Sequence, residues 1–368
     1  MIVSPPKRQA DGSLQASVSY PDGTTRTTSI SANAPLVDDG TPWLAATLPV
    51  AMKRGCALRI EGGADDLALK NSEAAQDVLA GWHPGVMSRI AVEVDDVTNG
   101  SPAAGVGCFF SGGVDSFYSV LTHLDEITHL VFVTGFDIDV SNDELAAEAL
   151  AGARASAKAL GKTLLEVKTD IRVLGEDVLD WGVHFHGAAL AAVGLALSDT
   201  LGRVIIPSSY HRDDLYPWGS HPDLDPRWSS SRVTFEHDGV DVTRPEKVRA
   251  IAQHQVALDH LRVCWENRDN AFNCGRCEKC LRTMINLRSV DALRRCKTLP
   301  TRLDISAVRR MKLSHGAALF AGENLRELQG LPDRDRALEK ALQRTIRRQR
   351  LRAPLGRIKR RVQALRAS

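Results

Sequence analysis

Residues 107–116 read GCFFSGGVDS, and this stretch decides the fold. Its first four residues are small or apolar, as in a buried strand, and a helical pattern follows over residues 115–124. The two glycines let the backbone turn sharply and bring bare N–H groups close to an anion, while the next helix directs its positive N-terminal end to the same place. The stretch therefore predicts a strand, a phosphate-binding loop and a helix. It is not the Walker loop, because the ending Gly-Lys-Ser/Thr is missing.

Strands and helices alternate from residue 106 onward. Further strands are expected at residues 129–134, 163–167 and 203–207, and further helices at residues 142–160 and 181–197. Strands separated by such helices imply a parallel sheet covered on both faces, and right-handed crossovers leave few topologies. The expected fold class is therefore α/β with a parallel-sheet, Rossmann-like core, in which ligands bind at the carboxyl ends of the strands.

The sequence also predicts a cysteine-based metal site. Cys274, Cys277 and Cys280 stand two residues apart, and Cys264 precedes them by nine residues. Four thiolates at this spacing can close a tetrahedral zinc site, with the first cysteine expected on a neighbouring strand. Iron–sulfur ligation and redox or catalytic thiols are the alternatives. A closed four-cysteine zinc site has no open position for water, so its expected task is rigidity.

Residues 1–100 are expected to form a separate α+β lobe. Short strands are expected around a Pro21-Asp22-Gly23 turn within residues 17–30 and at residues 56–60 and 89–94, with a helix over residues 71–81 that starts at Asn71 or Ser72. Residues 95–105, rich in Gly, Pro and Ser, read as a linker. The expected domains are thus the lobe at 1–100, a nucleotide-binding domain at 101–262, a zinc knuckle at 263–295 and a helical segment with a basic tail at 296–368.

The formal charge of +2 hides a basic tail. Residues 340–368 hold eleven Lys or Arg and no Asp or Glu, which leaves 36 basic against 45 acidic residues in the rest of the chain. Contact with nucleic acid or an anionic membrane is one interpretation of this tail, and a solvated, partly helical end is the other. The cations concerned include Arg344, Arg347, Arg348, Arg350, Arg352, Arg357, Lys359, Arg360 and Arg361.

Apolar runs and cysteine usage indicate a compartment. The longest apolar helical run, residues 188–197, is far below the roughly 20 residues that a bilayer span needs, and nothing near Met1 reads as a signal peptide. Of seven cysteines, four lie within residues 264–280 and three are scattered, which is metal-site spacing rather than a secreted disulfide framework. We therefore expect a cytoplasmic chain without a transmembrane segment.

The sequence Ser-Gly-Gly-Val-Asp-Ser after an apolar strand resembles the PP-loop of the ATP pyrophosphatase family. The resemblance implies binding of ATP, attack of a substrate oxygen on the α-phosphate, release of pyrophosphate and an adenylated intermediate. It implies that Ser111, Gly112, Gly113, Val114 and Ser116 cradle the phosphates and that Asp115 holds Mg²⁺. It also puts adenine beside Thr134-Gly135-Phe136, where a plain strand-ending turn is the alternative.

The loop and the cysteines together resemble 7-cyano-7-deazaguanine synthase, over about residues 106–290. The segments Leu281-Arg282 and Thr243-Arg244-Pro245-Glu246-Lys247 also look like that family's, and the resemblance implies zinc on the four cysteines. It implies an ATP-dependent C–N ligase that adenylates a small-molecule carboxylate, which ammonia or another nitrogen nucleophile then attacks. The chain departs from the family in its segments before the loop and behind the cysteines, and Asp213-Asp214-Leu215-Tyr216-Pro217-Trp218 matches the family's substrate segment only in part.

The remaining candidate site residues have structural roles as their alternatives. His186 and His184 open the helix at 181–197 and are expected to contact phosphate or substrate, or else to cap or pack. Lys247, with Ser111 and Asp115, completes the expected catalytic set, and Arg244 is a second cation; both cations could equally be exposed surface charges. Residues 208–227 are expected to form a substrate lid, or else an ordered loop whose Trp218 and Trp228 pack.

Two other function classes compete with the ligase. The same loop serves enzymes that thiolate a base or small molecule, but these need a reactive cysteine, and Cys108 reads as core while Cys56 and Cys296 lack a motif. A non-catalytic nucleotide-binding module is the third class, although its expected broken loop is not seen here. A homodimer is compatible with the sequence.

Overall fold

The computed structural model describes residues 1–138 and 141–367, with the side chains of the last helix described as far as Leu351. Contacts divide the chain into two compact units. The first, the sheet unit, holds residues 1–111 and 115–240, and the second, the helical unit, holds residues 112–114 and the chain from 241 onward. The four domains expected from the sequence are thus grouped into two units, and the segment expected to bind nucleotide, 101–262, has residues in both.

The sheet unit is built on one eleven-stranded sheet with the order β11-β10-β7-β8-β9-β4-β3-β1-β5-β6, and β2 pairs with β3. Neighbours from β11 through β9 are parallel, as are β1 with β5 and β5 with β6, so the sheet is mostly parallel and the fold class is α/β. The strands are β1 Ile2–Val3, β2 Lys7–Arg8, β3 Leu14–Ser19, β4 Thr25–Ala32, β5 Leu58–Asp65, β6 Val92–Thr98, β7 Gly105–Phe109, β8 His129–Thr134, β9 Thr163–Thr169, β10 Leu201–Pro207 and β11 Thr234–Asp238.

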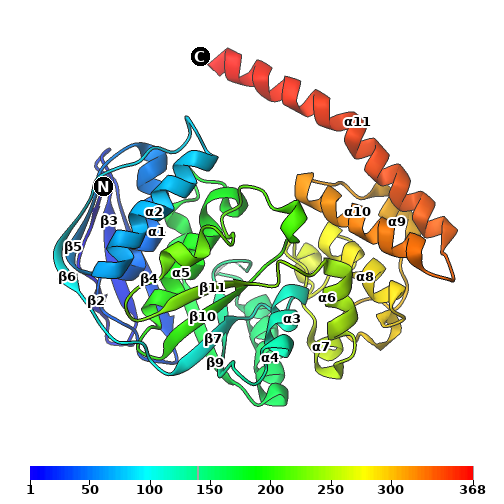
Figure 1. Cartoon of the computed structure of the whole chain (residues 1–368), viewed down its shortest axis with the longest axis horizontal. Helices are drawn as coiled ribbons and strands as arrows, with labels where there is room; N and C mark the ends of the chain where they lie inside the picture. Colours follow the sequence, from blue (N-terminus) through cyan, green and yellow to red (C-terminus); the bar gives the residue numbers. More distant parts are fainter. Residues whose placement is uncertain (139–140, 368) are drawn as a thin grey trace. The chain divides into compact units, whose positions relative to one another are not determined.

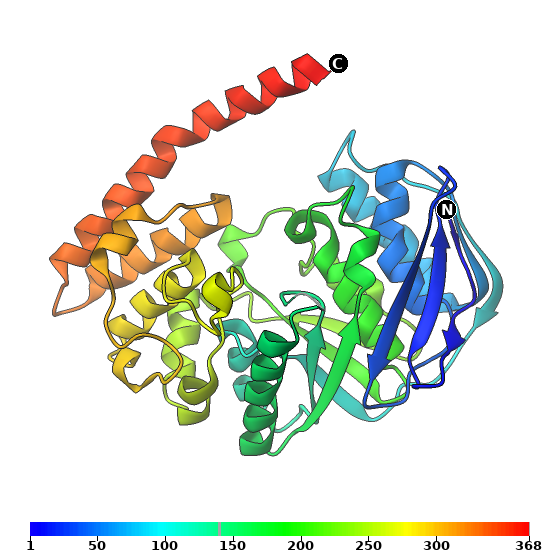
Figure 2. The same cartoon turned by 180° about the vertical axis from the view of Figure 1, so that it is seen from behind.

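The N-terminal strands join the same sheet as the α/β core. Strand β4 pairs antiparallel with β9, and Ile30 lies opposite Thr169 in that register. Figure 2 shows β3 and β4 side by side on this part of the sheet. Pairing with β4 covers an edge of the parallel strands that would otherwise expose unpaired N–H and C=O groups. Residues 1–100, expected as a separate lobe, therefore lie in one unit with the following strands.

The helices of the sheet unit are α1 Thr41–Arg54, α2 Asp66–Trp82, α3 Val114–Thr122, α4 Asp143–Leu160 and α5 His186–Ala196, the last preceded by a π-turn at Trp181–Phe185. Helix α1, which the sequence did not predict, packs against α5 (Figure 1). Every residue of α1 from Thr41 to Met52 is buried. A helix that is apolar all round shows no amphipathic period, and Pro49 inside α1 argues against a helix, so the pattern was missed.

Helix α2 and strand β6 have other bounds than those expected. Helix α2 begins at Asp66 rather than at Asn71, because the carboxylate of Asp65 caps it by accepting a hydrogen bond from the backbone N–H of Ala68 at 3.0 Å. Strand β6 continues to Thr98 and so occupies the first part of the expected linker at 95–105.

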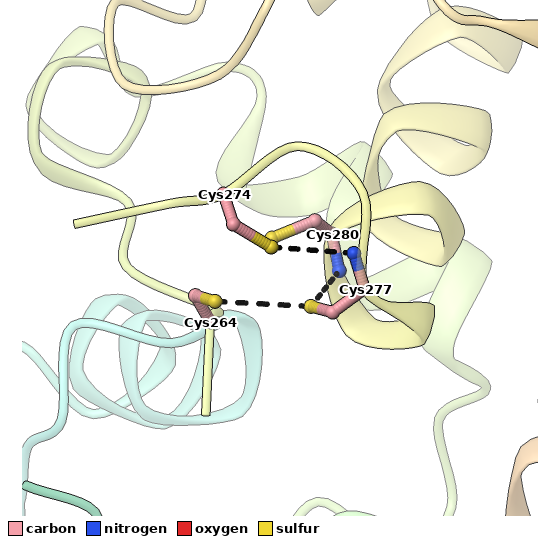
Figure 3. A group of neighbouring side chains, drawn as sticks. All are labelled: Cys264, Cys274, Cys277 and Cys280. Atoms are coloured by element: carbon pink, nitrogen blue, oxygen red, sulfur yellow. Dashed lines mark hydrogen bonds between the residues drawn. The ribbon is translucent and has the colours of Figure 1, made fainter. Parts of the chain in front are cut away.

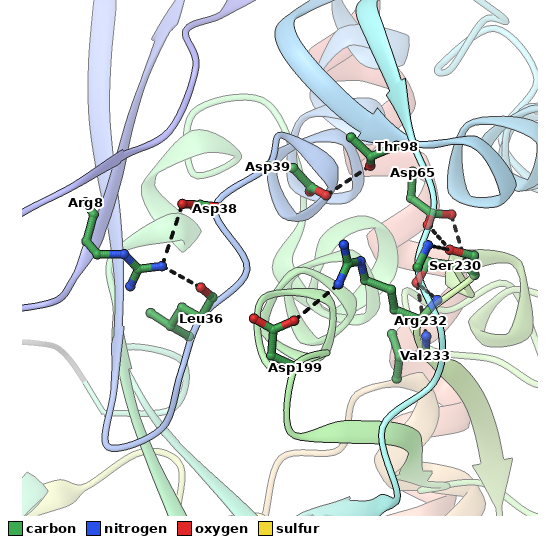
Figure 4. A network of polar contacts seen from close by, with 12 residues as sticks. Arg8, Leu36, Asp38, Asp39, Asp65, Thr98, Asp199, Ser230, Arg232 and Val233 are labelled. Carbon is green, nitrogen blue, oxygen red and sulfur yellow. Dashed lines mark hydrogen bonds and ion pairs between the residues drawn. The ribbon is translucent and has the colours of Figure 1, made fainter.

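A polar network ties the N-terminal segment to the later strands within the sheet unit (Figure 4). Asp65 also accepts a hydrogen bond from the backbone N–H of Ser231 at 2.9 Å, and the hydroxyl of Thr98 donates to Asp39 at 3.2 Å. Arg232 donates to Asp199 at 3.2 Å. Asp65 is buried, so the hydrogen bonds that satisfy its carboxylate fix the corner between β5 and α2.

The helical unit contains α6 Arg244–Ile251, α7 Gln255–His260, α8 Glu278–Ser289, α9 Ile305–Arg310, α10 His315–Gly330 and α11 Arg336–Ala367. Its buried apolar side chains include Met284, Ile285, Phe320 and Leu342. The start of α11 packs against α9 and α10. The tail cations Arg352, Arg357, Lys359, Arg360 and Arg361 lie outside the described side chains. Among the described residues, no helix is long and apolar enough to cross a bilayer.

Candidate functional site

The predicted phosphate loop joins the end of β7 at Phe109 to the start of α3 at Val114. Gly112 has a φ of +73°, a left-handed conformation that side-chain-bearing residues rarely adopt. A Cβ there would stand 3.5 Å from the nearest atom, so the backbone angle and not crowding requires glycine. The backbone N–H of Arg262 donates to the carbonyl of Gly112 at 2.7 Å, which fixes the turn.

The predicted phosphate-binding residues lie together in this loop and the first turn of α3. Ser111 is exposed, Ser116 is buried, and Asp115 is half-buried in the first turn of the helix with its Oδ1 atom covered. A carboxylate and backbone N–H groups at a helix N-terminus form the kind of place that binds phosphate together with a divalent cation. The side chain of Val114 is buried, which leaves its backbone N–H as its group at the loop.

Two side-chain contacts attach α3 to the end of β11. Ser119 donates to a carboxylate oxygen of Asp238 at 2.5 Å, and Nε2 of His123 lies 3.0 Å from the other oxygen. Burial opposes protonation of His123, but hydrogen bonds to Asp238 and Glu126 outweigh it and raise the pKa of the imidazole. Asp238 ends β11, a strand that the sequence reading missed, so no local signal pointed to this link.

The end of β8 carries the residues expected beside adenine. Thr134 is the last residue of β8, Gly135 has a φ of +111°, and Phe136 is buried. The ring of Phe136 lies 5.2 Å from that of Trp181, and the guanidinium carbon of Arg172 lies 4.7 Å from the Trp181 ring centre. Phe136 is thus held in place by packing, next to a cation–π pair.

The two segments that the sequence singled out, 181–197 and 208–227, contribute side chains to one aromatic cluster. Its members are His186, Tyr210, Tyr216, Trp218 and Trp181. The Trp218 ring lies 5.6 Å from His186, 5.9 Å from Tyr210 and 5.6 Å from Tyr216. His186 is 6.2 Å from Trp181. The hydroxyls of Tyr210 and Tyr216 are 2.7 Å apart. The rings around Trp218 thus pack edge to face against one another, with the two tyrosine hydroxyls hydrogen-bonded to each other.

The titratable side chains His186 and Tyr216 of this cluster are uncharged near neutral pH. Burial lowers the pKa of His186, so its imidazole is neutral. Burial, followed by the hydrogen bond to Tyr210, raises the pKa of Tyr216 well above its ordinary value. Two glycines let the cluster close: a Cβ on Gly182 would stand 2.3 Å from the Trp218 ring, and one on Gly187 would stand 1.9 Å from the carbonyl of Gly219.

His184 has a different environment from His186. Its Nδ1 accepts a hydrogen bond from the backbone N–H of Asp180 at 3.0 Å, and its ring lies 4.6 Å from His83. Burial lowers its pKa. These contacts make His184 a packed, turn-closing histidine, which was the alternative reading.

The helical unit buries an unusual number of cations. Lys247 is 1% exposed and Arg244 is 6% exposed, so the expectation that they could be surface charges is wrong. The guanidinium carbons of Arg282 of α8 and Arg244 lie 4.0 Å and 5.1 Å from the ring centre of Phe320, and Arg262 is buried as well. Arg282 also lies 3.5 Å from the carboxylate of Glu278. Cation–π contacts and ion pairs of this kind offset the cost of burying charge.

The four predicted cysteines come together (Figure 3). Their Sγ atoms all lie within 4.8 Å of one another, and Cys264 and Cys277 are 3.8 Å apart. A tetrahedral zinc site with bonds of about 2.3 Å separates its sulfurs by about 3.8 Å, so the cluster fits zinc. Hydrogen bonds from Cys277 and Cys280 lower the pKa of the Cys264 thiol.

Backbone geometry shapes the cysteine cluster. Gly275 has a φ of +65° inside the knuckle, and Cys277 caps the N-terminus of α8. Asn273, which the sequence reading did not single out, accepts hydrogen bonds from the N–H groups of Val263 and Cys264 at 2.9 and 3.1 Å. Cys264 lies in an irregular segment and not on the expected strand. Its backbone is therefore positioned by the hydrogen bond to Asn273 and not by strand pairing.

Comparisons of the chain with protein-family models, with curated proteins and with solved structures found no match. The functional interpretation therefore rests on the residues themselves: the glycine loop before α3, the aromatic cluster, the buried cations of the helical unit and the four cysteines.

Proposed function

We propose that the protein uses ATP to adenylate a carboxylate and that a nitrogen nucleophile then displaces AMP. One observation carries the proposal: a strand passes through a left-handed glycine directly into a helix whose first turn bears a carboxylate, in the sequence Ser111 to Ser116. This arrangement offers N–H donors, a helix N-terminus and a magnesium ligand to one polyphosphate. It also agrees with the PP-loop resemblance of the sequence.

The proposed reaction has two steps. A substrate carboxylate oxygen attacks the α-phosphorus of ATP, the bond from that phosphorus to the oxygen of the β-phosphate breaks, and pyrophosphate leaves. Ammonia or an amine then attacks the acyl carbon, AMP leaves with the electron pair of the C–O bond, and the nitrogen loses a proton. The activation is needed because a bare carboxylate expels oxide poorly.

The loop residues have separate roles in this proposal. Asp115 would hold Mg²⁺, whose chemistry would be to neutralise negative charge on the phosphates. The N–H groups of Gly112 to Val114 and the hydroxyls of Ser111 and Ser116 bind the phosphates. Because Gly112 is already fixed by Arg262, little reorganisation is required when ATP binds.

The buried cations and the aromatic cluster supply charge and selectivity. Lys247 and Arg244 are our candidates for stabilising pyrophosphate, because both stand in the segment Thr243-Arg244-Pro245-Glu246-Lys247 that the resemblance includes, and cations stabilise a departing polyanion. Thr134, Gly135, Phe136 and His186 are the candidates for the adenine side. Tyr210, Tyr216 and Trp218 are the candidates for selecting the acid, because neutral aromatic faces favour a flat substrate over a small aliphatic one.

Zinc has a structural role in the proposal. Cys264, Cys274, Cys277 and Cys280 would hold the ion with four thiolates, which would leave it no open position for a substrate. It would link the segment before Asn273 to the start of α8.

Sulfur transfer receives less support than amide formation. The scattered cysteines would have to supply a thiolate, but Cys108 is fully buried and burial strongly raises the pKa of its thiol. Cys296 is buried too, and Cys56 is half-buried at the end of α1. Cys108 and Cys296 are thus shielded from solvent, whereas the sulfur of Cys56 lies 4.0 Å from the N-terminal ammonium of Met1 but stands in no motif of a reactive thiol.

The test combines ATP, Mg²⁺, ammonia and a panel of carboxylates that includes 7-carboxy-7-deazaguanine with the full chain. We expect AMP and pyrophosphate with one acid class, and acid-dependent exchange of labelled pyrophosphate into ATP. Asp115→Ala should abolish both. Asp125→Ala, which removes an exposed carboxylate just beyond α3, should not. Release of ADP and phosphate, or no nucleotide turnover with any acid, would overturn the proposal.

A further inference from the structure

Helix α11 has one face made of cations. Leu338, Ala341, Leu342 and Thr345 are buried on its inner side. On its outer side, the exposed residues Arg336, Lys340, Arg344, Arg347 and Arg350 follow one another at intervals of three or four. These intervals place the five cations on one side of a helix, along about 21 Å at 1.5 Å per residue. The solvent-facing side of this helix therefore carries roughly one positive charge per turn.

Helix α9 packs against α11 and is followed by further exposed cations. The Thr345 hydroxyl of α11 donates to the carbonyl of Val308 at 2.9 Å, and the Arg348 guanidinium donates to the carbonyl of Met311 at 2.7 Å. These contacts hold the end of α9 against the middle of α11. The exposed side chains of Arg309, Arg310 and Lys312 follow in the same segment.

Few carboxylates neutralise these charges. Glu339 forms an ion pair with Arg334, and Asp335 forms one with Arg288. Both carboxylates at the start of α11 are therefore already paired with other arginines. Asp304 lies 3.7 Å from Arg310, and both are exposed. Within the described part of the chain, Arg309, Lys312, Lys340, Arg344, Arg347 and Arg350 have no carboxylate within 4.0 Å.

We infer that this cationic ridge, formed by Lys340, Arg344, Arg347 and Arg350 of α11 with Arg309, Arg310 and Lys312 of α9, binds the phosphate backbone of a nucleic acid. Regularly spaced, uncompensated cations on a rigid helix neutralise successive phosphates and release their counterions, without reading bases. The inference is independent of the adenylation proposal, because no ridge residue belongs to the loop, the aromatic cluster or the buried cations.

The ridge favours nucleic acid over an anionic membrane. A helix that binds in the plane of a membrane needs an apolar face turned to the lipid. The apolar face of the described part of α11 is already buried against α9 and α10. Among the described residues of α9 and α11, Leu351, at 67% exposed, is the one large apolar side chain left open.

The test measures binding of the full chain to a fluorescein-labelled random duplex of about 20 base pairs, by anisotropy between about 50 and 200 mM NaCl. We expect binding that weakens steeply with salt. The double variant Arg344→Gln/Arg347→Gln should weaken it at every salt concentration and reduce the slope of log K against log salt by about 1.8, since each phosphate contact contributes about 0.9.

The matched control is Arg59→Gln/Arg154→Gln, which removes the same charge from exposed positions of the sheet unit. It should leave the salt slope unchanged, and thermal unfolding should show that both double variants fold. Equal loss in both, or no effect of the ridge variant, would contradict the inference. Binding to phosphatidylglycerol vesicles without binding to the duplex would also overturn it and would assign the ridge to a lipid surface.

Discussion

The backbone of the predicted phosphate loop requires glycine at position 112. Its φ of +73° lies in the left-handed region, where a Cβ costs about 1 kcal/mol or more. We expect Gly112→Ala to lower the free energy of unfolding by about 1 kcal/mol and to abolish acid-dependent pyrophosphate exchange, because the strained turn would move the N–H donors. Urea denaturation and the exchange assay measure the two effects.

Gly161 offers a matched control for that substitution. It has a φ of +66° at the C-terminus of α4, and a Cβ there would meet nothing within 4 Å. Gly161→Ala should therefore cost a similar free energy of unfolding and leave exchange intact. Equal loss of exchange in both variants would mean that stability, and not the geometry of the loop, explains the effect.

The sequence indicated candidate residues that stand in a contiguous motif. It did not indicate residues whose contacts depend on the tertiary structure. Ser111 to Ser116 and the four cysteines each stand within a short stretch whose spacing has a physical meaning. Asn273 and Arg262 act through backbone groups several residues away or elsewhere in the chain, at contacts that no local pattern signals. The burial of Lys247 is likewise a property of packing, since a lysine in an isolated sequence reads as surface.

At the scale of elements, the attachment of α3 to β11 through His123 and Asp238 has a measurable pH dependence. Hydrogen bonds to Asp238 and Glu126 raise the pKa of His123 in the folded chain despite its burial. A raised folded-state pKa contributes stability below the unfolded pKa, which is lost as pH rises through the folded value. We therefore expect the free energy of unfolding to decline above about pH 6.5 in the wild type, and His123→Gln to remove that part of the decline.

NMR titration of the histidine ring protons checks this directly. His123 should titrate above 6.5, whereas His129 of β8, whose pKa burial lowers, should titrate below 6.5 in the same spectra. If His123 titrated with or below His129, the hydrogen bonds to Asp238 would not dominate its electrostatics and the predicted pH dependence would be wrong.

Elements with a clear period were predicted well, and elements defined by burial were not. Strand β8 was expected at its observed bounds, and α4 begins one residue after the predicted start because Asn142 is its cap. Helix α1 was missed since it is apolar on every side, and β11 was missed because its sequence, TFEHD, is short and polar. Both are held by tertiary packing, which overrides local propensity.

At the scale of the whole molecule, the largest difference between expectation and structure is the extent of the sheet. Composition changes near residue 100 suggested a boundary, yet β4 pairs with β9 and continues the sheet into the N-terminal strands. Ile30 and Thr169 are far apart in the sequence, and a pairing at that distance leaves no local signal. The polar network of Asp65 with Ser231 reinforces the same union.

The helical unit connects the cysteine cluster to the phosphate loop through a short series of contacts. Asn273 fixes the backbone N–H of Cys264, and two residues earlier the N–H of Arg262 donates to Gly112. Loss of zinc should therefore loosen the loop. We expect one zinc ion per chain by elemental analysis and faster amide exchange at Arg262 in Cys264→Ser, with ATP binding weakened about tenfold, a coupling of about 1.4 kcal/mol.

Cys56→Ser is the matched control, because Cys56 lies outside the cluster at the end of α1. It should keep the zinc, the protection of the Arg262 amide and the affinity for ATP. Zinc loss from Cys264→Ser without any change in exchange at Arg262 would show that the knuckle and the loop are independent. Faster amide exchange at Arg262 without weaker ATP binding would confirm the contact between the knuckle and the loop but would contradict ATP binding by the loop. A loosened loop must bind phosphate less well if phosphate is its ligand.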